Sequence, residues 1–196
     1  TALTPATPLP KVQLAADVDG DGFAELIGLD MQANPITWRV YCPRASCRFT
    51  SGQVWMAQLI VPGGTPVVGD WNADGKADIG SFDGTTRWSF AISTGTTFAE
   101  RSPWGFYGQP GTTPFVGDFN GDGYSDVGVW DKATARWSVA LNKGKAVSPS
   151  VEETVARFES MQTWATDLGP ANPNNGRPRT GDLTGDGLTE VFLQES

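Results

Sequence analysis

The residues best suited to chemistry lie in a nine-residue loop near the middle of the chain. Oxygen-bearing side chains occupy positions 1, 3, 5 and 9 of this loop: Asp118, Asn120, Asp122 and Asp126. Calcium takes six to eight such oxygens at roughly 2.3–2.6 Å. Gly123 permits the sharp turn that folds the oxygens inward, and Tyr124 would offer its backbone carbonyl. The loop therefore predicts a calcium site.

The same loop occurs four times, so up to four Ca²⁺ ions are predicted. The predicted ligands, with a backbone carbonyl at position 7, are Asp17, Asp19, Asp21, Phe23 and Glu25 in the first copy; Asp70, Asn72, Asp74, Lys76 and Asp78 in the second; Asp118, Asn120, Asp122, Tyr124 and Asp126 in the third; and Asp182, Thr184, Asp186, Leu188 and Glu190 in the fourth. Thr184 is a neutral and weaker ligand, and calcium is favoured most strongly in the second and third copies.

Two other interpretations of the loop need to be weighed. An EF-hand requires a glutamate at position 12 and flanking helices, but position 12 holds Gly28, Ser81, Val129 or Leu193, and the flanks alternate as strands do. The loops could also be Asx-turn hairpins without metal. Clustered carboxylates that are not neutralised repel one another, which favours calcium in β-hairpin loops.

Charge and composition exclude several classes of protein. The net charge is −8 and disfavours nucleic acid and anionic membranes as partners. Most of the 22 acidic residues lie in the four loops, and four bound Ca²⁺ ions would offset the net charge. No apolar run has the length of a membrane-spanning helix, so membrane insertion is not expected. Histidine is absent, which removes the commonest general base and zinc ligand.

The loops divide the chain into repeated units. Residues 1–10 contain three prolines and are interpreted as an arm or linker; units begin near residues 11, 65, 113 and 178. Each complete unit combines strand patterns before and after the loop with a third strand that carries Trp38, Trp88 or Trp137, and then a closing segment. The closing segment of the third unit is predicted to be a short helix near residues 151–160 or a longer strand.

Repeats of this length with four strands each are typical of β-propellers. The predicted fold class is all-β: a β-propeller-like array of four-stranded blades, three complete units plus a half unit, with calcium loops in the hairpins. A closed propeller needs at least four blades. The missing strands could come from residues 1–10, from a second copy in a homodimer, or from sequence outside these 196 residues.

The second and third copies carry a family resemblance. Residues 68–80, Val-Gly-Asp-Trp-Asn-Ala-Asp-Gly-Lys-Ala-Asp-Ile-Gly, and the matching residues 116–128 resemble FG-GAP repeats, also called VCBS repeats. These repeats are the calcium-binding blades of integrin-α-like propellers and of many secreted bacterial proteins. The first copy departs from the pattern at Ala15-Ala16 and the fourth at Thr184.

This resemblance implies a secreted or cell-surface binding or adhesion module that recognises an extracellular glycan or protein. Weak candidates for the ligand site are Trp71, Trp130, Tyr107, Asn174 and Asn175, whereas Trp38, Trp88 and Trp137 are expected in the core. The alternative is a non-catalytic accessory domain of a larger secreted enzyme or toxin. The acids outside the loops form no recognisable catalytic motif, so an enzyme such as a polysaccharide-degrading one is not expected.

The two cysteines bear on localisation. Cys42 and Cys47 are five residues apart and could close a small disulfide loop in a secreted protein, or could be two reduced thiols. The disulfide is favoured because millimolar calcium and oxidising conditions both belong outside the cytosol.

Overall fold

The computed structural model describes residues 12–45, 51–60, 62–144, 157–166 and 176–194. The proline-rich arm at residues 1–10 lies outside this part. Regular structure in the described residues consists of β-strands, which confirms the all-β class. No helix among the described residues is long and apolar enough to cross a membrane.

The strands form three four-stranded antiparallel sheets and one two-stranded sheet, each in chain order. Unit 1 contains β1 (Val12–Ala16), β2 (Glu25–Asp30), β3 (Thr37–Tyr41) and β4 (Gln53–Ala57). Unit 2 contains β5 (Thr65–Gly69), β6 (Asp78–Phe82), β7 (Arg87–Ser93) and β8 (Phe98–Phe106). Unit 3 contains β9 (Thr113–Gly117), β10 (Asp126–Asp131), β11 (Arg136–Ala140) and β12 (Gln162–Ala165). Unit 4 contains β13 (Arg177–Gly181) and β14 (Glu190–Gln194).

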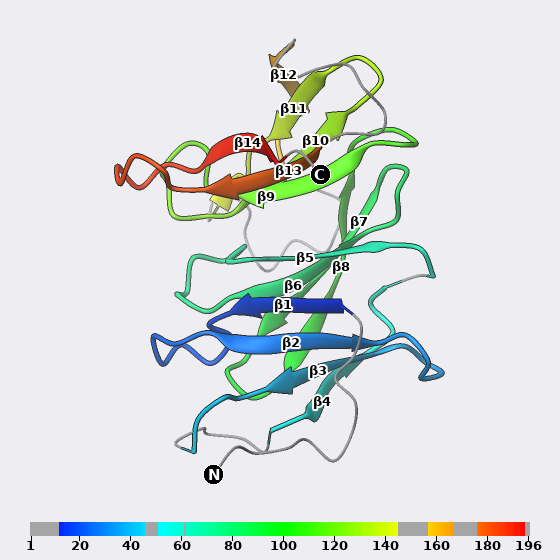
Figure 1. The fold of residues 1–196 in the computed structure, drawn as a ribbon, viewed down its shortest axis with the longest axis vertical. Coiled ribbons are helices and arrows are strands. Elements are labelled where there is room, and N and C mark those ends of the chain that lie inside the picture. The colour runs from blue at the N-terminus through cyan, green and yellow to red at the C-terminus, as the bar shows by residue number, and fades with distance from the viewer. Residues whose placement is uncertain (1–11, 46–50, 61, 145–156, 167–175, 195–196) are drawn as a thin grey trace.

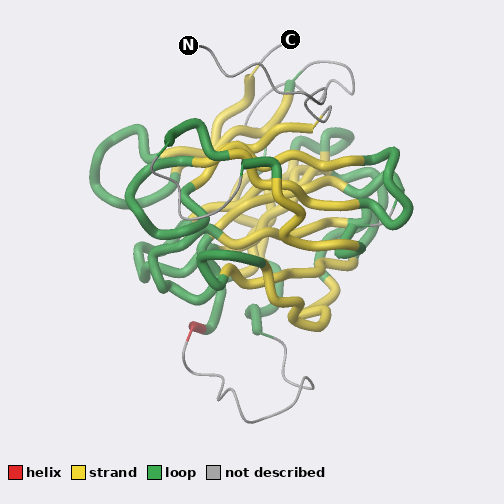
Figure 2. Tube along the Cα trace, turned by 90° about the horizontal axis from the view of Figure 1, so that it is seen from below, coloured by secondary structure: helices red, strands yellow, loops and turns green. Residues whose placement is uncertain are grey.

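The sheets are joined through their first strands. β1 contacts β5, β5 contacts β9, and β9 contacts β13. Figure 1 shows unit 1 at the lower end of the long axis, unit 2 above it, and units 3 and 4 together at the upper end, with β13 beside β9. Figure 2 shows the same strands from below, with the connecting loops gathered around the sheets. Residues far apart in sequence are therefore brought together at each junction between units.

Each junction buries an apolar core built on alternating side chains. In β3 and β7 the residues Trp38, Val40, Trp88 and Phe90 face inward and are fully buried. Three clusters result: one at units 1 and 2, one at units 2 and 3, and one around Phe115 and Trp137 of unit 3 that contacts unit 4. The expectation that Trp38, Trp88 and Trp137 lie in the core is confirmed. Truncating such a buried aromatic side chain to alanine costs about 3–5 kcal/mol.

The closing segment of unit 3 differs from the helical expectation where it is described. Residues 151–156 of the expected helix lie outside the described residues. Residues 157–160 are not helical, and Phe158 instead forms an isolated antiparallel bridge with Asn142. The apolar side chain of Phe158 is buried in the core that units 2 and 3 share, which explains why its spacing from other apolar residues suggested an amphipathic element.

Candidate metal loops and a polar pocket

The four loops, named loop 1 (residues 17–25), loop 2 (70–78), loop 3 (118–126) and loop 4 (182–190), each connect the first and second strand of a unit. The aspartate at position 1 turns inward in every loop. Its Oδ2 accepts the backbone N–H of the position-6 glycine: 2.7 Å in Asp17–Gly22, 2.8 Å in Asp70–Gly75, 2.8 Å in Asp118–Gly123 and 3.0 Å in Asp182–Gly187. These glycines have φ near +85°, for example 86° at Gly123, a conformation in which other residues are strained.

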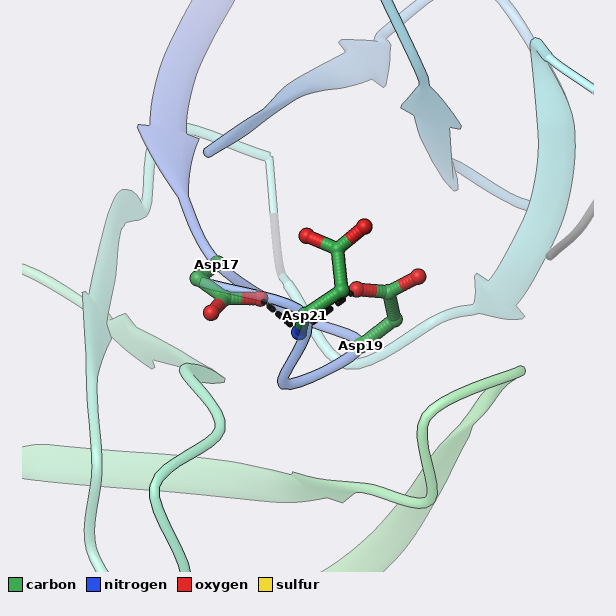
Figure 3. A group of neighbouring side chains, drawn as sticks. All are labelled: Asp17, Asp19 and Asp21. Carbon is green, nitrogen blue, oxygen red and sulfur yellow. Dashed lines mark hydrogen bonds between the residues drawn. The ribbon is translucent and has the colours of Figure 1, made fainter. Parts of the chain in front are cut away.

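Loop 1 gathers three carboxylates. One oxygen from each of Asp17, Asp19 and Asp21 lies within 4.8 Å of the others. Figure 3 shows the Asp21 amide donating to the side chains of Asp17 and Asp19, at 3.2 and 3.1 Å. Asp19 is only 4% exposed, and its Oδ2 has no hydrogen-bond partner. A buried oxygen without a partner is costly, so this donor set fits a bound cation.

Loop 4 gathers a second acidic group. Oxygens of Asp182, Asp186 and Glu190 also lie within 4.8 Å of one another. Thr184 at position 3 donates its hydroxyl proton to Glu190 Oε1 at 3.1 Å. In this arrangement Thr184, the weaker of the predicted ligands, holds the Glu190 carboxylate in place. Loop 4 is exposed to solvent at most of its positions.

Loops 2 and 3 use their position-9 aspartates differently. Asp78 and Asp126 are fully buried, and both carboxylate oxygens of each accept a backbone N–H. Asp78 binds the amides of Trp71 (3.0 Å) and Ser93 (2.7 Å), and Asp126 binds those of Phe119 (3.0 Å) and Asn142 (2.7 Å). Burial raises the pKa of each of these aspartates to about 7, against the lowering effect of the amides. The position-9 carboxylate therefore fastens the loop to the end of the third strand in unit 2 and to the segment just after the third strand in unit 3.

In loops 2 and 3 the asparagine at position 3 forms two hydrogen bonds with the aspartate at position 5. Asn72 donates its amide proton to Asp74 Oδ2 at 3.1 Å, and Asn120 donates to Asp122 Oδ2 at 3.0 Å. The side-chain carbonyls of the same asparagines accept the backbone amides of Asp74 and Asp122. These contacts tie position 3 to position 5 in each of the two loops.

Adjacent loops are hydrogen-bonded to each other in a repeated way. The carbonyl of each position-1 aspartate accepts the position-8 amide of the next loop: Asp17 from Ala77 (2.7 Å), Asp70 from Ser125 (2.7 Å) and Asp118 from Thr189 (2.8 Å). Two side chains add a second hydrogen bond between neighbouring loops: Ser125 Oγ accepts the backbone N–H of Asp70, and Thr189 Oγ1 accepts the backbone N–H of Asp118. The four loops thus form one continuous hydrogen-bonded row, here called the loop row.

The aromatic candidates for a ligand site are mostly in the core. Trp71 and Trp130 are 0% and 2% exposed, so neither presents a face to a sugar ring; both pack in the cores at the unit junctions. Tyr107 is half-buried and donates its hydroxyl to the Phe158 carbonyl at 3.0 Å. Asn174 and Asn175 lie outside the described residues.

Tyr107 lines a pocket of about 490 Å³ at the junction of units 2 and 3. Its polar lining comes from β10, β11 and β12 of unit 3 and from the segments that precede β9 and β12: Gln109, Asp131, Arg136, Ser138, Ser160 and Thr163. Asp131 contacts two of the other lining side chains: Gln109 Nε2 lies 3.4 Å and Arg136 Nη2 lies 4.0 Å from its Oδ2.

A smaller pocket of about 230 Å³ repeats this arrangement at the junction of units 1 and 2. Its lining includes Asp83, Arg87 and Ser89, which stand in the same places of unit 2 as Asp131, Arg136 and Ser138 in unit 3. Sequence reasoning missed both pockets. The signal available was the repeated Arg-Trp-Ser at residues 87–89 and 136–138, which was interpreted only as a strand.

Cys42 is disulfide-bonded in the structure. Cys47, its predicted partner, lies outside the described residues. Cys42 is also buried at the end of β3, so the covalent link begins in the core of unit 1.

Comparison with known proteins agrees with this geometry at the level of the repeat and the fold. Residues 70–129, which span loops 2 and 3, match the FG-GAP-like repeat family, and this match confirms the FG-GAP resemblance that the motifs of these two loops indicated. No curated protein matches the chain.

The fold also occurs in a solved lectin. A lectin of Agrocybe aegerita, described by its specific recognition of non-reducing terminal N-acetylglucosamine, matches with a TM-score of 0.62 and 20% sequence identity. The match covers 91% of this chain and 45% of the lectin chain, so the present chain spans less than half the length of that protein. At this identity the likeness concerns the fold.

Proposed function

We propose that the chain is a calcium-stabilised, propeller-type binding module that acts outside the cell and recognises a glycan. The repeated four-stranded sheets, joined through β1, β5, β9 and β13, support an arrangement of the units as blades. The FG-GAP repeat and the lectin with the same fold support a binding role over a catalytic one. No catalytic activity is proposed.

The calcium part of this proposal rests on the chemistry of the loops. In loop 1, Asp17, Asp19, Asp21 and the Phe23 carbonyl would hold the ion, and the partnerless buried Oδ2 of Asp19 fits that role. The corresponding residues of loops 2, 3 and 4 would do the same. Calcium would supply a charge that neutralises carboxylates held close together, and the loops would thereby stay closed.

The glycan part rests on one observation, the polar pocket at the junction of units 2 and 3. Its volume of about 490 Å³ is within the range of ~300–1,000 Å³ typical of small-molecule sites. A carboxylate, a guanidinium and an amide converge there from Asp131, Arg136 and Gln109. Sugar hydroxyls both donate and accept hydrogen bonds, so they match a lining that contains acceptors and donors together. The ring of Tyr107 adds a partly apolar wall.

The test is a glycan array followed by titration of the best ligand. We expect hits among neutral saccharides, with terminal N-acetylglucosamine included in the panel. Arg136→Ala should weaken binding about 10-fold or more, since it removes hydrogen bonds from a charged donor worth ~1.5–3 kcal/mol. Arg39→Ala is the matched control, because Arg39 lies on β3 away from the pocket.

An array without hits, in the presence of properly folded protein, would contradict the glycan proposal. A protein partner captured in a pull-down would then favour adhesion to protein. The alternative, a non-catalytic accessory domain of a larger secreted enzyme or toxin, proposes the same module and differs only in the domains to which that module is joined.

The half unit suggests how a second copy could contribute. In the described residues β14 pairs with β13 alone, and Phe192 on β14 is 41% exposed. An open strand edge invites pairing with another chain. We therefore propose that unit 4 is completed either by strands of a second copy in a homodimer or by sequence outside these 196 residues.

A further inference from the structure

Loop 1 differs from the other loops in the basic side chain that closes it. Arg44, from the segment after β3, places Nη2 2.9 Å from both carboxylate oxygens of Asp21 and 3.2 Å from Oε1 of Glu25. Its guanidinium carbon also lies 4.0 Å from the ring centroid of Phe23. Arg44 therefore touches positions 5, 7 and 9 of the loop at once.

The backbone of unit 1 explains why an arginine is needed there. In units 2 and 3 the position-9 carboxylate accepts the amide of a residue at or just beyond the end of the third strand: Ser93, the last residue of β7, or Asn142, which follows β11. Strand register puts Pro43 at the corresponding place in unit 1, because Leu26 pairs with Tyr41 as Ile79 pairs with Ala91. Proline has no N–H to donate. The next residue, Arg44, supplies the missing donor to Glu25 from its side chain.

The position of Arg44 is fixed by its surroundings. Disulfide-bonded Cys42 lies two residues earlier, with Sγ 3.6 Å from the Arg44 carbonyl oxygen. Phe23, although 60% exposed, covers one face of the guanidinium. Glu25 is 1% exposed, so its ion pair with Arg44 is shielded from water on the carboxylate side.

We infer that Arg44 is the built-in counter-cation of loop 1: it keeps the loop closed without calcium and lowers the affinity of loop 1 for calcium. The reason is that the guanidinium already neutralises two of the carboxylates that would face the ion, and it repels a second cation placed a few ångströms away. The lowered affinity rests on the calcium part of the proposed function, whereas closure without calcium does not.

The consequence is a graded response among the units. Lys76 forms a weaker version of the contact in loop 2, with Nζ 2.8 Å from Asp74 Oδ2 only. In loops 3 and 4, position 7 is tyrosine or leucine and supplies no positive charge. Unit 1 should thus keep its loop closed at calcium concentrations at which loops 3 and 4 have lost their ions.

The first arm of the test measures thermal unfolding in chelator. Arg44→Met keeps much of the side-chain length and removes the charge; we expect its Tm to fall by roughly 4–10 °C relative to wild type. Arg39→Met is the matched control: Arg39 lies in the same unit, pairs with Asp30 at 3.9 Å and donates from Nη1 to the Gly52 carbonyl at 3.0 Å, and both of these partners lie outside loop 1. Arg44→Lys retains the charge and should recover part of the loss.

The second arm follows calcium binding loop by loop through amide NMR signals. The Gly22 amide reports on loop 1 and the Gly123 amide on loop 3, because each donates to its position-1 aspartate. Arg44→Met should tighten calcium binding at Gly22 about 10-fold or more and leave the midpoint at Gly123 unchanged.

The two arms separate the possible failures. Wild-type Tm for Arg44→Met in chelator, or weaker calcium binding at Gly22 in that variant, would overturn the counter-cation role. If no loop of any variant responds to calcium, the calcium part of the proposed function and the effect on affinity are both wrong, and the chelator melts still decide whether Arg44 closes the loop.

Discussion

At the scale of single residues, Asp78 and Asp126 carry an unusual combination of burial and charge. Each is fully buried between two backbone amides, and burial raises the pKa of each to about 7. An unfolded chain would return each group to a pKa near 3.9. The folded protein therefore binds protons on these groups more tightly than the unfolded chain does.

This difference predicts how stability depends on pH in calcium-free protein. The contribution of each group is fully present below about pH 4 and is lost as pH rises through about 7. The free energy of unfolding measured with urea in chelator should thus fall between pH 5 and pH 7.5. Asp126→Asn should remove roughly half of this dependence, since Asp78 remains, and should cost about 1–3 kcal/mol at pH 5 through a lost acceptor.

The control for that series is Asn120→Ser in the same loop. Asn120 is exposed and carries no titratable group, so its replacement leaves both buried carboxylates in place and should preserve the pH dependence of the wild type. A wild-type protein whose stability rises steadily from pH 5 to pH 7.5 would contradict the raised pKa values.

At the scale of elements, the contacts between loops are as regular as those within them. Thr189 at position 8 of loop 4 uses both its amide and its hydroxyl to hold Asp118 of loop 3. Thr189 also restricts which residue can occupy position 117, because a Cβ on Gly117 would lie 2.3 Å from the methyl carbon of Thr189. The glycine before loop 3 therefore permits the close approach of loop 4.

Thr189→Val tests the side-chain part of this contact. The change keeps the shape and removes the oxygen that accepts the Asp118 amide, so we expect a loss of about 0.5–1.5 kcal/mol in the free energy of unfolding. Hydrogen exchange at the Asp118 amide should become faster. The control is Thr163→Val on exposed β12; equal effects of the two changes would show that the contact between loops 3 and 4 contributes nothing.

Much of the element scale could be predicted from the sequence, because a repeat displays the same pattern several times. The strands around each loop and the burial of Trp38, Trp88 and Trp137 followed from alternation of apolar residues. Trp71 and Trp130 were misjudged as ligand candidates, since their burial depends on a neighbouring unit and not on their own strand. Arg44 was missed because its partners lie 19 and 23 residues earlier in the chain.

At the scale of the whole molecule, calcium is expected to act on all junctions together. Ions that bind only the folded state stabilise it by ~2.7 kcal/mol per site at 100 times the dissociation constant. We therefore expect the Tm in 2 mM CaCl₂, a concentration typical of extracellular sites (order of 10⁻³ M), to exceed that in chelator by several degrees. Calorimetric titration should show up to four sites.

Magnesium is the control ion, because it demands near-ideal octahedral geometry and gives up its waters reluctantly. Light scattering in the same buffers reports whether two copies pair. Absence of both binding heat and a Tm difference would mean that the loops are hairpins held by their own hydrogen bonds.

The loop row has a consequence for how such a protein can change in length. Each loop presents the same carbonyl to the unit that follows and the same amide to the unit that precedes it. A duplicated or deleted unit would therefore meet neighbours with matching groups on both sides. Whole units could therefore be gained or lost during evolution without new contacts between units. The pockets at the junctions would be duplicated or deleted together with the units.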